Sequence, residues 1–123
     1  IGVEQDPLAL AYSRSQLVVA SRAAHLPGPI DGPTRDPEQL AEGVALTRQM
    51  GMTGKLALRS TDADLINKGL SPSDADIKWA REFVEQFNSH GGKPKDGSDL
   101  PRLNRARIIL DKATMLGIAT ASA

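Results

Sequence analysis

The sequence has no cysteine and very few aromatic residues. Among its 123 residues are no Cys, one Trp, one Tyr and two Phe. The absence of cysteine excludes a disulfide framework, a thiolate nucleophile and a cysteine-based metal site, and it fits a reducing compartment, so we expect a cytoplasmic protein. With so few aromatics, the core must consist mainly of Ala, Leu, Ile and Val, which favours helices packed on a parallel sheet.

A dominant charge of one sign and long apolar runs are also missing. Lys and Arg number 15 and so do Asp and Glu, which gives a formal net charge of zero. No stripe of basic residues interleaved with aromatics occurs, so we expect no nucleic-acid partner. No apolar run is long enough to cross a bilayer, so we expect no membrane association. Residues 1–6 lack the pattern of a signal peptide, and the chain reads as the interior of a longer sequence.

Helix start and stop signals recur along the chain. Asp-Pro pairs at 6–7 and 36–37 predict two helix N-termini, because Asp caps a helix and Pro is favoured in its first turn. Residues 71–74, Ser-Pro-Ser-Asp, predict the start of a longer helix that ends by the glycine pair 91–92. A polar linker follows, and Asp-Leu-Pro at 99–101 predicts the start of a last helix.

Two short segments have the properties of strands. One lies around Ile30, and the other is the compact apolar run 54–59, which we predict to be buried on both faces; a third candidate ends at Val3. Alternation of strands and helices implies parallel pairing, because a parallel neighbour is reached only through a crossover. We therefore predict an α/β fold in which residues 1–70 close a larger domain and residues 71–123 form a helical extension.

Four segments occur together, in this order, in a known family. They are the helix and Ile-Asp-Gly strand within 12–32, Met-Gly-Met-Thr-Gly-Lys at 50–55, residues 66–73, and Asp-Gly-Ser-Asp-Leu-Pro at 96–101. Together they resemble the C-terminal portion of citrate-lyase β-subunit-like proteins, which are CoA-ester lyases of the HpcH/HpaI aldolase superfamily. The last segment has a small deletion before its second Asp.

The resemblance implies a fold and an activity. The fold would be a (β/α)8 barrel, with 1–70 as its closing βα units and 71–123 as a C-terminal lid exchanged between subunits of a homo-oligomer, suspected to be a trimer. The activity would be carbon–carbon cleavage or condensation of a β-hydroxyacyl-CoA of the malyl-CoA or citramalyl-CoA type. Mg²⁺ would hold the carboxylate and the adjacent oxygen of the substrate.

Three acidic residues are candidates for this chemistry by position in the resemblance. Asp99 matches the family's Asp that transfers a proton at the acyl-CoA in the neighbouring subunit's site, although from sequence alone it is more simply a helix N-cap. Glu4 and Asp6 lie where the family has its metal-binding Gly-x-Glu-Asp strand. The residues that follow them are too few for that strand, so a loop of the family pattern is missing.

Asp31, Lys55 and Arg59 are candidates for binding the substrate or CoA. Asp31 at a strand end either lines the pocket or stabilises a turn. Arg59 could hold a carboxylate or a CoA phosphate in bidentate fashion, with a surface ion pair as the alternative, and the alternative for Lys55 is a solvated lysine. Residues 58–60, Leu-Arg-Ser, replace the family's Ile-His-Pro, which predicts a different substrate pocket.

Two other functions remain open. One is a metal-dependent hydroxy-acid aldolase that acts without CoA, and a basic pocket for the phosphates of the nucleotide would distinguish the two enzymes. The other is a structural or assembly role without chemistry. Because a third of a barrel lacks most of an active site, we expect the chain alone to be inactive even if the longer protein is a lyase.

Overall fold

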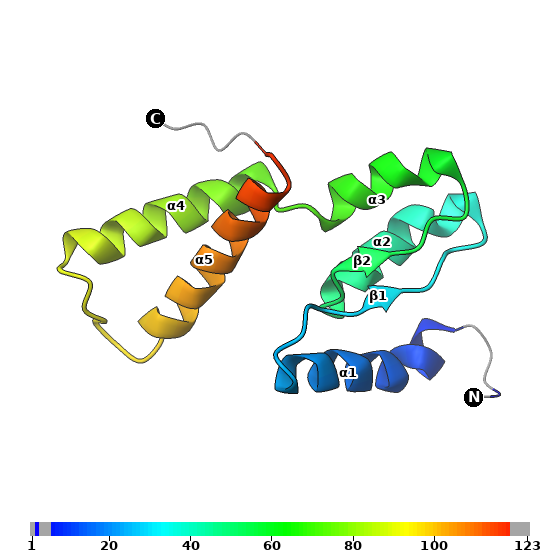
Figure 1. Cartoon of the computed structure of the whole chain (residues 1–123), viewed down its shortest axis with the longest axis horizontal. Coiled ribbons are helices and arrows are strands. Elements are labelled where there is room, and N and C mark those ends of the chain that lie inside the picture. The colour runs from blue at the N-terminus through cyan, green and yellow to red at the C-terminus, as the bar shows by residue number, and fades with distance from the viewer. Residues whose placement is uncertain (1, 3–5, 119–123) are drawn as a thin grey trace. The chain divides into compact units, whose positions relative to one another are not determined.

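The computed structural model describes residue 2 and residues 6–118. The chain forms two compact units, 1–70 and 71–123. Helices and two very short strands alternate along the first unit, and two long helices make up the second (Figure 1). The elements in chain order are α1 (Pro7–Ala23), β1 (Ile30–Asp31), η1 (Pro37–Gln39), α2 (Leu40–Gln49), β2 (Gly54–Lys55), η2 (Ser60–Asp62), α3 (Ala63–Leu70), α4 (Asp74–Ser89) and α5 (Asp99–Met115).

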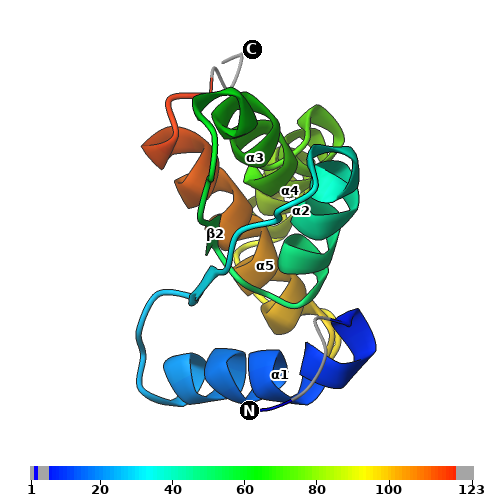
Figure 2. The same ribbon diagram turned by 90° about the vertical axis from the view of Figure 1, so that its right-hand side faces the viewer.

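The first unit is built on a two-stranded parallel sheet. Residues 30–31 of β1 pair in register with residues 54–55 of β2. Helices α2 and α3 lie side by side and share a buried apolar cluster of Leu40, Val44, Ile66 and Leu70 (Figures 1 and 2). Gly69 allows this close approach, because a Cβ at that position would collide with a methyl group of Val44. The α2–α3 pair therefore carries the small core of this unit.

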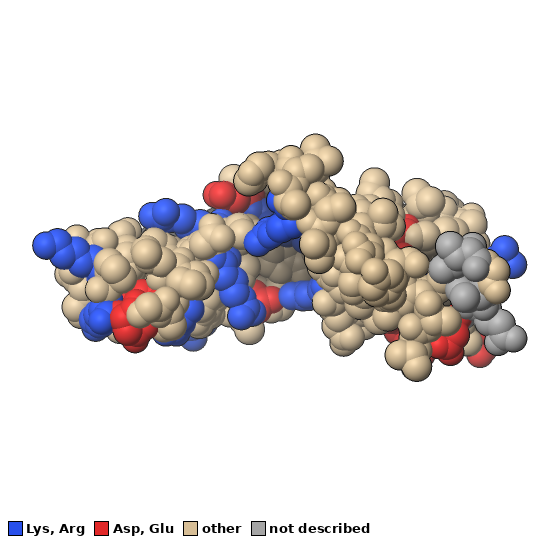
Figure 3. All heavy atoms as spheres, turned by 90° about the horizontal axis from the view of Figure 1, so that it is seen from below, with Lys and Arg blue, Asp and Glu red and all other residues tan. Residues whose placement is uncertain are grey.

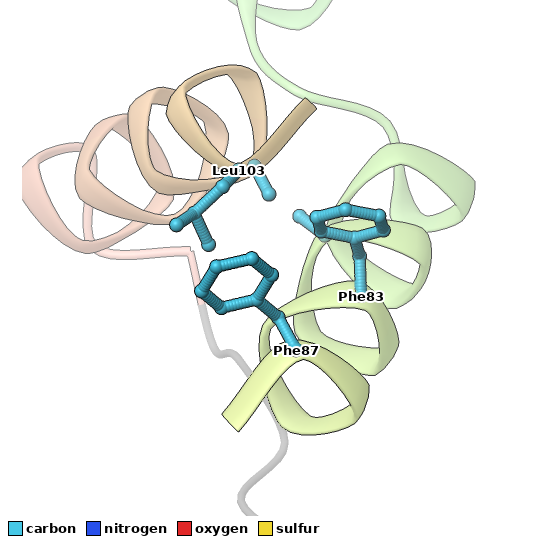
Figure 4. Close-up of a cluster of buried hydrophobic side chains, with 5 residues drawn as sticks. Phe83, Phe87 and Leu103 are labelled. Atoms are coloured by element: carbon cyan, nitrogen blue, oxygen red, sulfur yellow. The ribbon is translucent and has the colours of Figure 1, made fainter. Parts of the chain in front are cut away.

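The second unit is a helical hairpin in which α5 returns along α4 (Figure 1). Phe83 and Phe87 of α4 and Leu103 of α5 point toward one another (Figure 4), and Ala80 and Ala106, both fully buried, complete the cluster. Small residues at these two positions let the helices approach closely enough for the phenyl rings to fill the space between them. Residues 75–117 thus have an apolar core of their own.

The predicted helix starts at Asp6 and Ser73 are confirmed, whereas the N-cap of α5 is Ser98, so the reading of Asp99 as an N-cap is wrong. The side chain of Asp6 accepts a hydrogen bond from the backbone N–H of Leu8 at 2.8 Å, which caps α1. Ser73 and Asp76 form a reciprocal capping box at the start of α4. The signal at Asp36 differs slightly, since its side chain caps the 3₁₀ turn η1, and α2 begins directly after that turn, at Leu40. These helix starts can be predicted from the sequence, because the capping side chains bond to backbone groups only a few residues away.

The predicted strand over 54–59 is only partly confirmed. The strand spans Gly54–Lys55, and Leu56 and Leu58 are 56% and 55% exposed rather than buried on both faces. Within the described residues, β2 pairs with β1 alone, whereas a central strand is buried between two neighbouring strands and the elements packed on both faces of the sheet. The prediction of buried Leu56 and Leu58 is therefore wrong for this structure.

The predicted α/β class is confirmed for one parallel strand pair, whereas most described residues are helical. The described part of the chain does not show a (β/α)8 barrel, and the candidate strand ending at Val3 lies outside the described residues. Across residues 6–118, no helix is long and apolar enough to span a bilayer.

Candidate functional site

The carboxylate of Asp31, at the C-terminal end of β1, is the most heavily hydrogen-bonded acidic group among the described residues of the first unit. Asp31 is 5% exposed. Arg14 of α1 donates from Nε to Oδ1 at 3.2 Å and from Nη2 to Oδ2 at 3.4 Å. The Gly32 N–H donates to Oδ1 at 2.9 Å, and the Thr47 hydroxyl of α2 lies 2.6 Å from Oδ2. Three elements thus converge on one carboxylate.

Lys55 completes this cluster from β2. Its Nζ donates to the carbonyl oxygen of Gly32 at 2.8 Å and lies 3.5 Å from Oδ2 of Asp31. The side chain is 2% exposed, so the alternative of a solvated surface lysine is wrong. The Thr47 hydroxyl also lies 2.9 Å from the Gly43 carbonyl, but its single proton serves one acceptor at a time, and the charged carboxylate is the stronger one.

The cluster keeps Asp31 ionised. Burial by itself raises the pKa of the Asp31 carboxyl, but the Thr47 hydroxyl, the Lys55 and Arg14 cations and the Gly32 N–H together hold the pKa below its usual value. The donors fill the roughly four lone-pair sites of a carboxylate. Asp31 therefore joins α1, α2 and the sheet, and its role in substrate binding stays a prediction.

The guanidinium of Arg59 donates hydrogen bonds within the first unit. Its Nε donates to Oδ1 of Asp62 at 2.9 Å, and its Nη1 and Nη2 donate to the carbonyls of Arg35 and Thr34 at 2.9 and 3.4 Å. The hydrogen bond from the Arg59 side chain is the main cause that lowers the pKa of the Asp62 carboxyl. Asp62 is buried, so this is not the surface ion pair that the sequence left open. Binding of substrate by Arg59 stays a prediction.

Asp99 lies in a pocket of about 210 Å³ in the second unit. It is the first residue of α5, one position after the N-cap Ser98, and it is half-buried. Its Oδ2 accepts a hydrogen bond from the backbone N–H of Lys95 at 2.7 Å, which fixes the carboxylate relative to the preceding loop. The residues that line the pocket are Phe83, Gln86, Phe87, His90, Lys93, Lys95, Asp96, Asp99 and Arg102.

The expected metal ligands do not form a site in the described structure. Glu4 lies outside the described residues, and the Asp6 carboxylate caps α1. Among residues 6–118, no three His, Asp or Glu side chains come close enough together to hold a metal ion. The described residues therefore do not fit the implied Mg²⁺.

Sequence reasoning missed several contributors to both clusters. Arg14 and Thr47 lie 17 and 16 positions from Asp31, so no local motif indicates that they meet it. In the second unit, the polar linker provides Lys93 and Lys95 to the pocket of Asp99. The spacing of Asp99 and Arg102, three residues apart on one helix, was the available signal, because such pairs share a helix face.

Comparisons with known proteins agree with the resemblance. Residues 75–117 match the HpcH/HpaI aldolase C-terminal domain. Mitochondrial citramalyl-CoA lyase of Homo sapiens is 30% identical over 125 residues, and that of Rattus norvegicus is 28% identical over 123 residues. Each alignment covers 91% of this chain and 36% of the relative, so the chain spans about a third of the length of the curated relatives it matches.

Part of a solved structure also has the fold of this chain. It is CitE from Mycobacterium tuberculosis in complex with magnesium, acetoacetate and coenzyme A, with a TM-score of 0.69 at 21% sequence identity. The match covers 92% of this chain and 43% of that chain. Residues 75–117 therefore match the HpcH/HpaI aldolase C-terminal domain, and most of the chain is similar to part of the citramalyl-CoA lyases in sequence and to part of CitE in fold.

Proposed function

We propose that the protein carrying this chain is a CoA-ester lyase that cleaves, or in reverse condenses, a β-hydroxyacyl-CoA of the malyl-CoA or citramalyl-CoA type. The observation that carries the proposal is the position of Asp99, a half-buried acid in a pocket within the matched domain 75–117. The relatives named citramalyl-CoA lyase support the substrate class, and the coenzyme A in the CitE structure supports a CoA thioester.

The reaction requires two proton transfers. In the cleavage direction, the β-hydroxyl loses its proton, the bond between the hydroxyl carbon and the acyl α-carbon breaks, and its electron pair passes to the α-carbon as a thioester enolate. The Asp99 carboxyl would then give its proton to that carbon, and in condensation the carboxylate would take it back. The hydrogen bond from the Lys95 N–H holds the Asp99 carboxylate in place for this transfer.

The cofactor, barrel and assembly are further parts of the proposal. Mg²⁺ is supported by the magnesium in the CitE structure, and its ligands would come from residues other than those described in this chain. When bound, the metal would polarise the carbonyl that forms as the bond breaks. Residues 1–70 would close a (β/α)8 barrel, and residues 71–123 would form a lid whose Asp99 serves a neighbouring subunit of a homo-oligomer, with a trimer as the suspected assembly.

The test is a lyase assay on the product of the complete reading frame that encodes this chain. Malyl-CoA and citramalyl-CoA are supplied with Mg²⁺, and the Asp99→Asn variant is compared with wild type. We expect kcat to fall about 10²- to 10⁴-fold, the usual contribution of a general acid or base. Asp111→Asn, an exposed acid on the same helix, is the matched control and should keep full activity.

The assay also separates the alternatives. Full activity of Asp99→Asn would exclude the assigned role of this residue. Cleavage of a hydroxy acid without CoA, in place of either thioester, would favour the metal-dependent aldolase. No turnover of any of these substrates by the complete protein would favour a structural or assembly role, whereas inactivity of residues 1–123 alone is expected under the proposed function.

A further inference from the structure

The Asp99 pocket is lined by three cationic side chains that form no close ion pair with a described carboxylate. Lys93, Lys95 and Arg102 line it, and across the described residues no carboxylate lies within ion-pair distance of their charged groups. On the face seen in Figure 3, Lys and Arg side chains gather over the part of the chain that holds α4 and α5. A small hollow lined by three cations without close ion pairs is complementary to an anion.

Arg102 distinguishes this pocket from a set of solvated lysines. Its guanidinium carbon lies over the buried Phe83 ring, 4.7 Å from the centroid, which is a cation–π contact. A cation–π contact does not use the N–H donors of the guanidinium in hydrogen bonds, and its planar set of donors suits the two oxygens of a carboxylate or phosphate. Among the described residues, the Arg102 side chain donates no hydrogen bond.

Two carboxylates in the lining oppose an anion, but neutral donors already serve both. Oδ1 of Asp96 accepts from the N–H and the hydroxyl of Ser98 at 2.7 and 2.6 Å, and Asp99 accepts from the N–H of Lys95. The charge of Arg102 also contributes to the lowered pKa of the Asp96 carboxyl, after the hydrogen bonds from Ser98, but neither carboxylate accepts a side-chain hydrogen bond from the three cations. The lining retains three cations against two carboxylates, with Phe83 and Phe87 as its apolar part.

We propose that the pocket formed by Lys93, Lys95 and Arg102 beside Asp99 is a binding subsite for an oxyanion group of the substrate. The identity of the substrate as an acyl-CoA rests on the proposed function, and the anion selectivity of the pocket does not. Two groups of such a substrate have the required chemistry: the carboxylate of the acyl chain and the phosphates of the nucleotide. Arg102 makes the bidentate contact, and the two lysines supply the surrounding charge.

The test is a titration of the 123-residue chain followed by amide NMR at constant ionic strength, so that screening stays equal throughout. CoA is the first probe, and 3′,5′-adenosine bisphosphate and malonate are then added separately to identify the phosphate or carboxylate source. We expect saturable shifts of the amides of residues 93–102 with CoA and with at least one of the two smaller anions. Chloride at matched ionic strength should not reproduce them.

Three variants make the expectation specific. Arg102→Gln should weaken binding on the order of tenfold, the effect of losing hydrogen bonds between charged groups. Arg105→Gln is the matched control, because Arg105 stacks on Trp79 at 5.4 Å on the same helix but does not line the pocket, and it should bind like wild type. Asp96→Asn should tighten binding about threefold, because it removes a repelling charge at an exposed site.

Several results would overturn the proposal. They are an absence of saturable shifts with all three probes, equal losses in Arg102→Gln and Arg105→Gln, and weaker binding in Asp96→Asn. If Arg102→Gln proves unfolded, the Asp96→Asn titration still decides the question, because its expected sign is opposite. Anion binding without lyase activity in the complete protein would refute the proposed function and leave this subsite supported, so the two failures are distinguishable.

Discussion

Replacing Asp31 by Asn tests whether its carboxylate holds the first unit together. The substitution keeps the shape of the side chain but removes its charge, which leaves the 2%-exposed Lys55 and the 20%-exposed Arg14 without their anion. Removing one partner of a buried ion pair costs about 3–5 kcal/mol. Because Arg14 retains part of its hydration, we expect about 3 kcal/mol, a large share of the roughly 5–15 kcal/mol that a folded domain holds.

The assay must separate the two units, since Trp79 fluorescence reports only on the second. Urea unfolding followed by the intensities of amide NMR peaks measures the unfolding of each unit separately. The Gly43 peak reports on the first unit, and the Ala106 peak reports on the second. We expect the midpoint for Gly43 to fall in Asp31→Asn. The control Asp64→Asn, which alters an exposed acid of α3, should change the free energy of unfolding by less than about 0.5 kcal/mol.

The difference in the free energy of unfolding between wild type and Asp31→Asn should depend on pH, and the direction follows from the lowered pKa of Asp31. The pKa of Asp31 is lowered in the folded chain, so its contribution is complete above the unfolded value of about 3.9 and is lost as the pH falls through the lower folded value. The difference in stability between wild type and Asp31→Asn should therefore shrink below about pH 4. A difference that stays constant from pH 6 to pH 3, or one below about 0.5 kcal/mol at pH 6, would refute this account of the cluster.

Two further substitutions test the helix packing and the helix start. Gly69→Ala should destabilise the first unit by about 1–3 kcal/mol, because the added Cβ collides with Val44. The double variant Gly69→Ala/Val44→Ala should lose less stability than the sum of the losses in the two single variants. Strictly additive losses in urea unfolding would contradict the contact. Ser73→Ala should cost about 1 kcal/mol of the stability of α4, and Ser73→Asp should restore it, as read from thermal unfolding of Trp79 fluorescence; equal melting of both variants would contradict the cap.

The helix ends were predictable because their causes are local. Asp6 binds N–H groups two and three residues ahead of it, and Ser73 exchanges hydrogen bonds with Asp76, so a short stretch of sequence contains the whole interaction. Burial of a side chain, unlike a helix cap, depends on residues that are distant in the sequence. Leu56 and Leu58 form an apolar run that is typical of a central strand, but their exposure depends on what lies beside β2, which the run itself does not encode.

The clusters illustrate the same limit for sites. Asp31 was identified as a candidate from its place at a strand end, whereas Arg14 and Thr47 reach it only because α1 and α2 fold back to the sheet. The environment of Lys55 could not be read from the sequence, because its near-complete burial arises from the same tertiary contacts. The family resemblance made Asp99 a candidate, which stays a prediction, and the structure adds which side chains surround it.

Burial of Lys55 has a consequence for covalent chemistry. An acyl group in solution must reach the nitrogen of an amine to react with it, and the Lys55 side chain is 2% exposed, with its Nζ donating to the carbonyl oxygen of Gly32 beside the Asp31 carboxylate. A reactive thioester or succinimidyl ester in solution therefore acylates the exposed lysines of this chain and leaves Lys55 unmodified. An unmodified Lys55 amine after acylation therefore indicates a molecule whose first unit is folded.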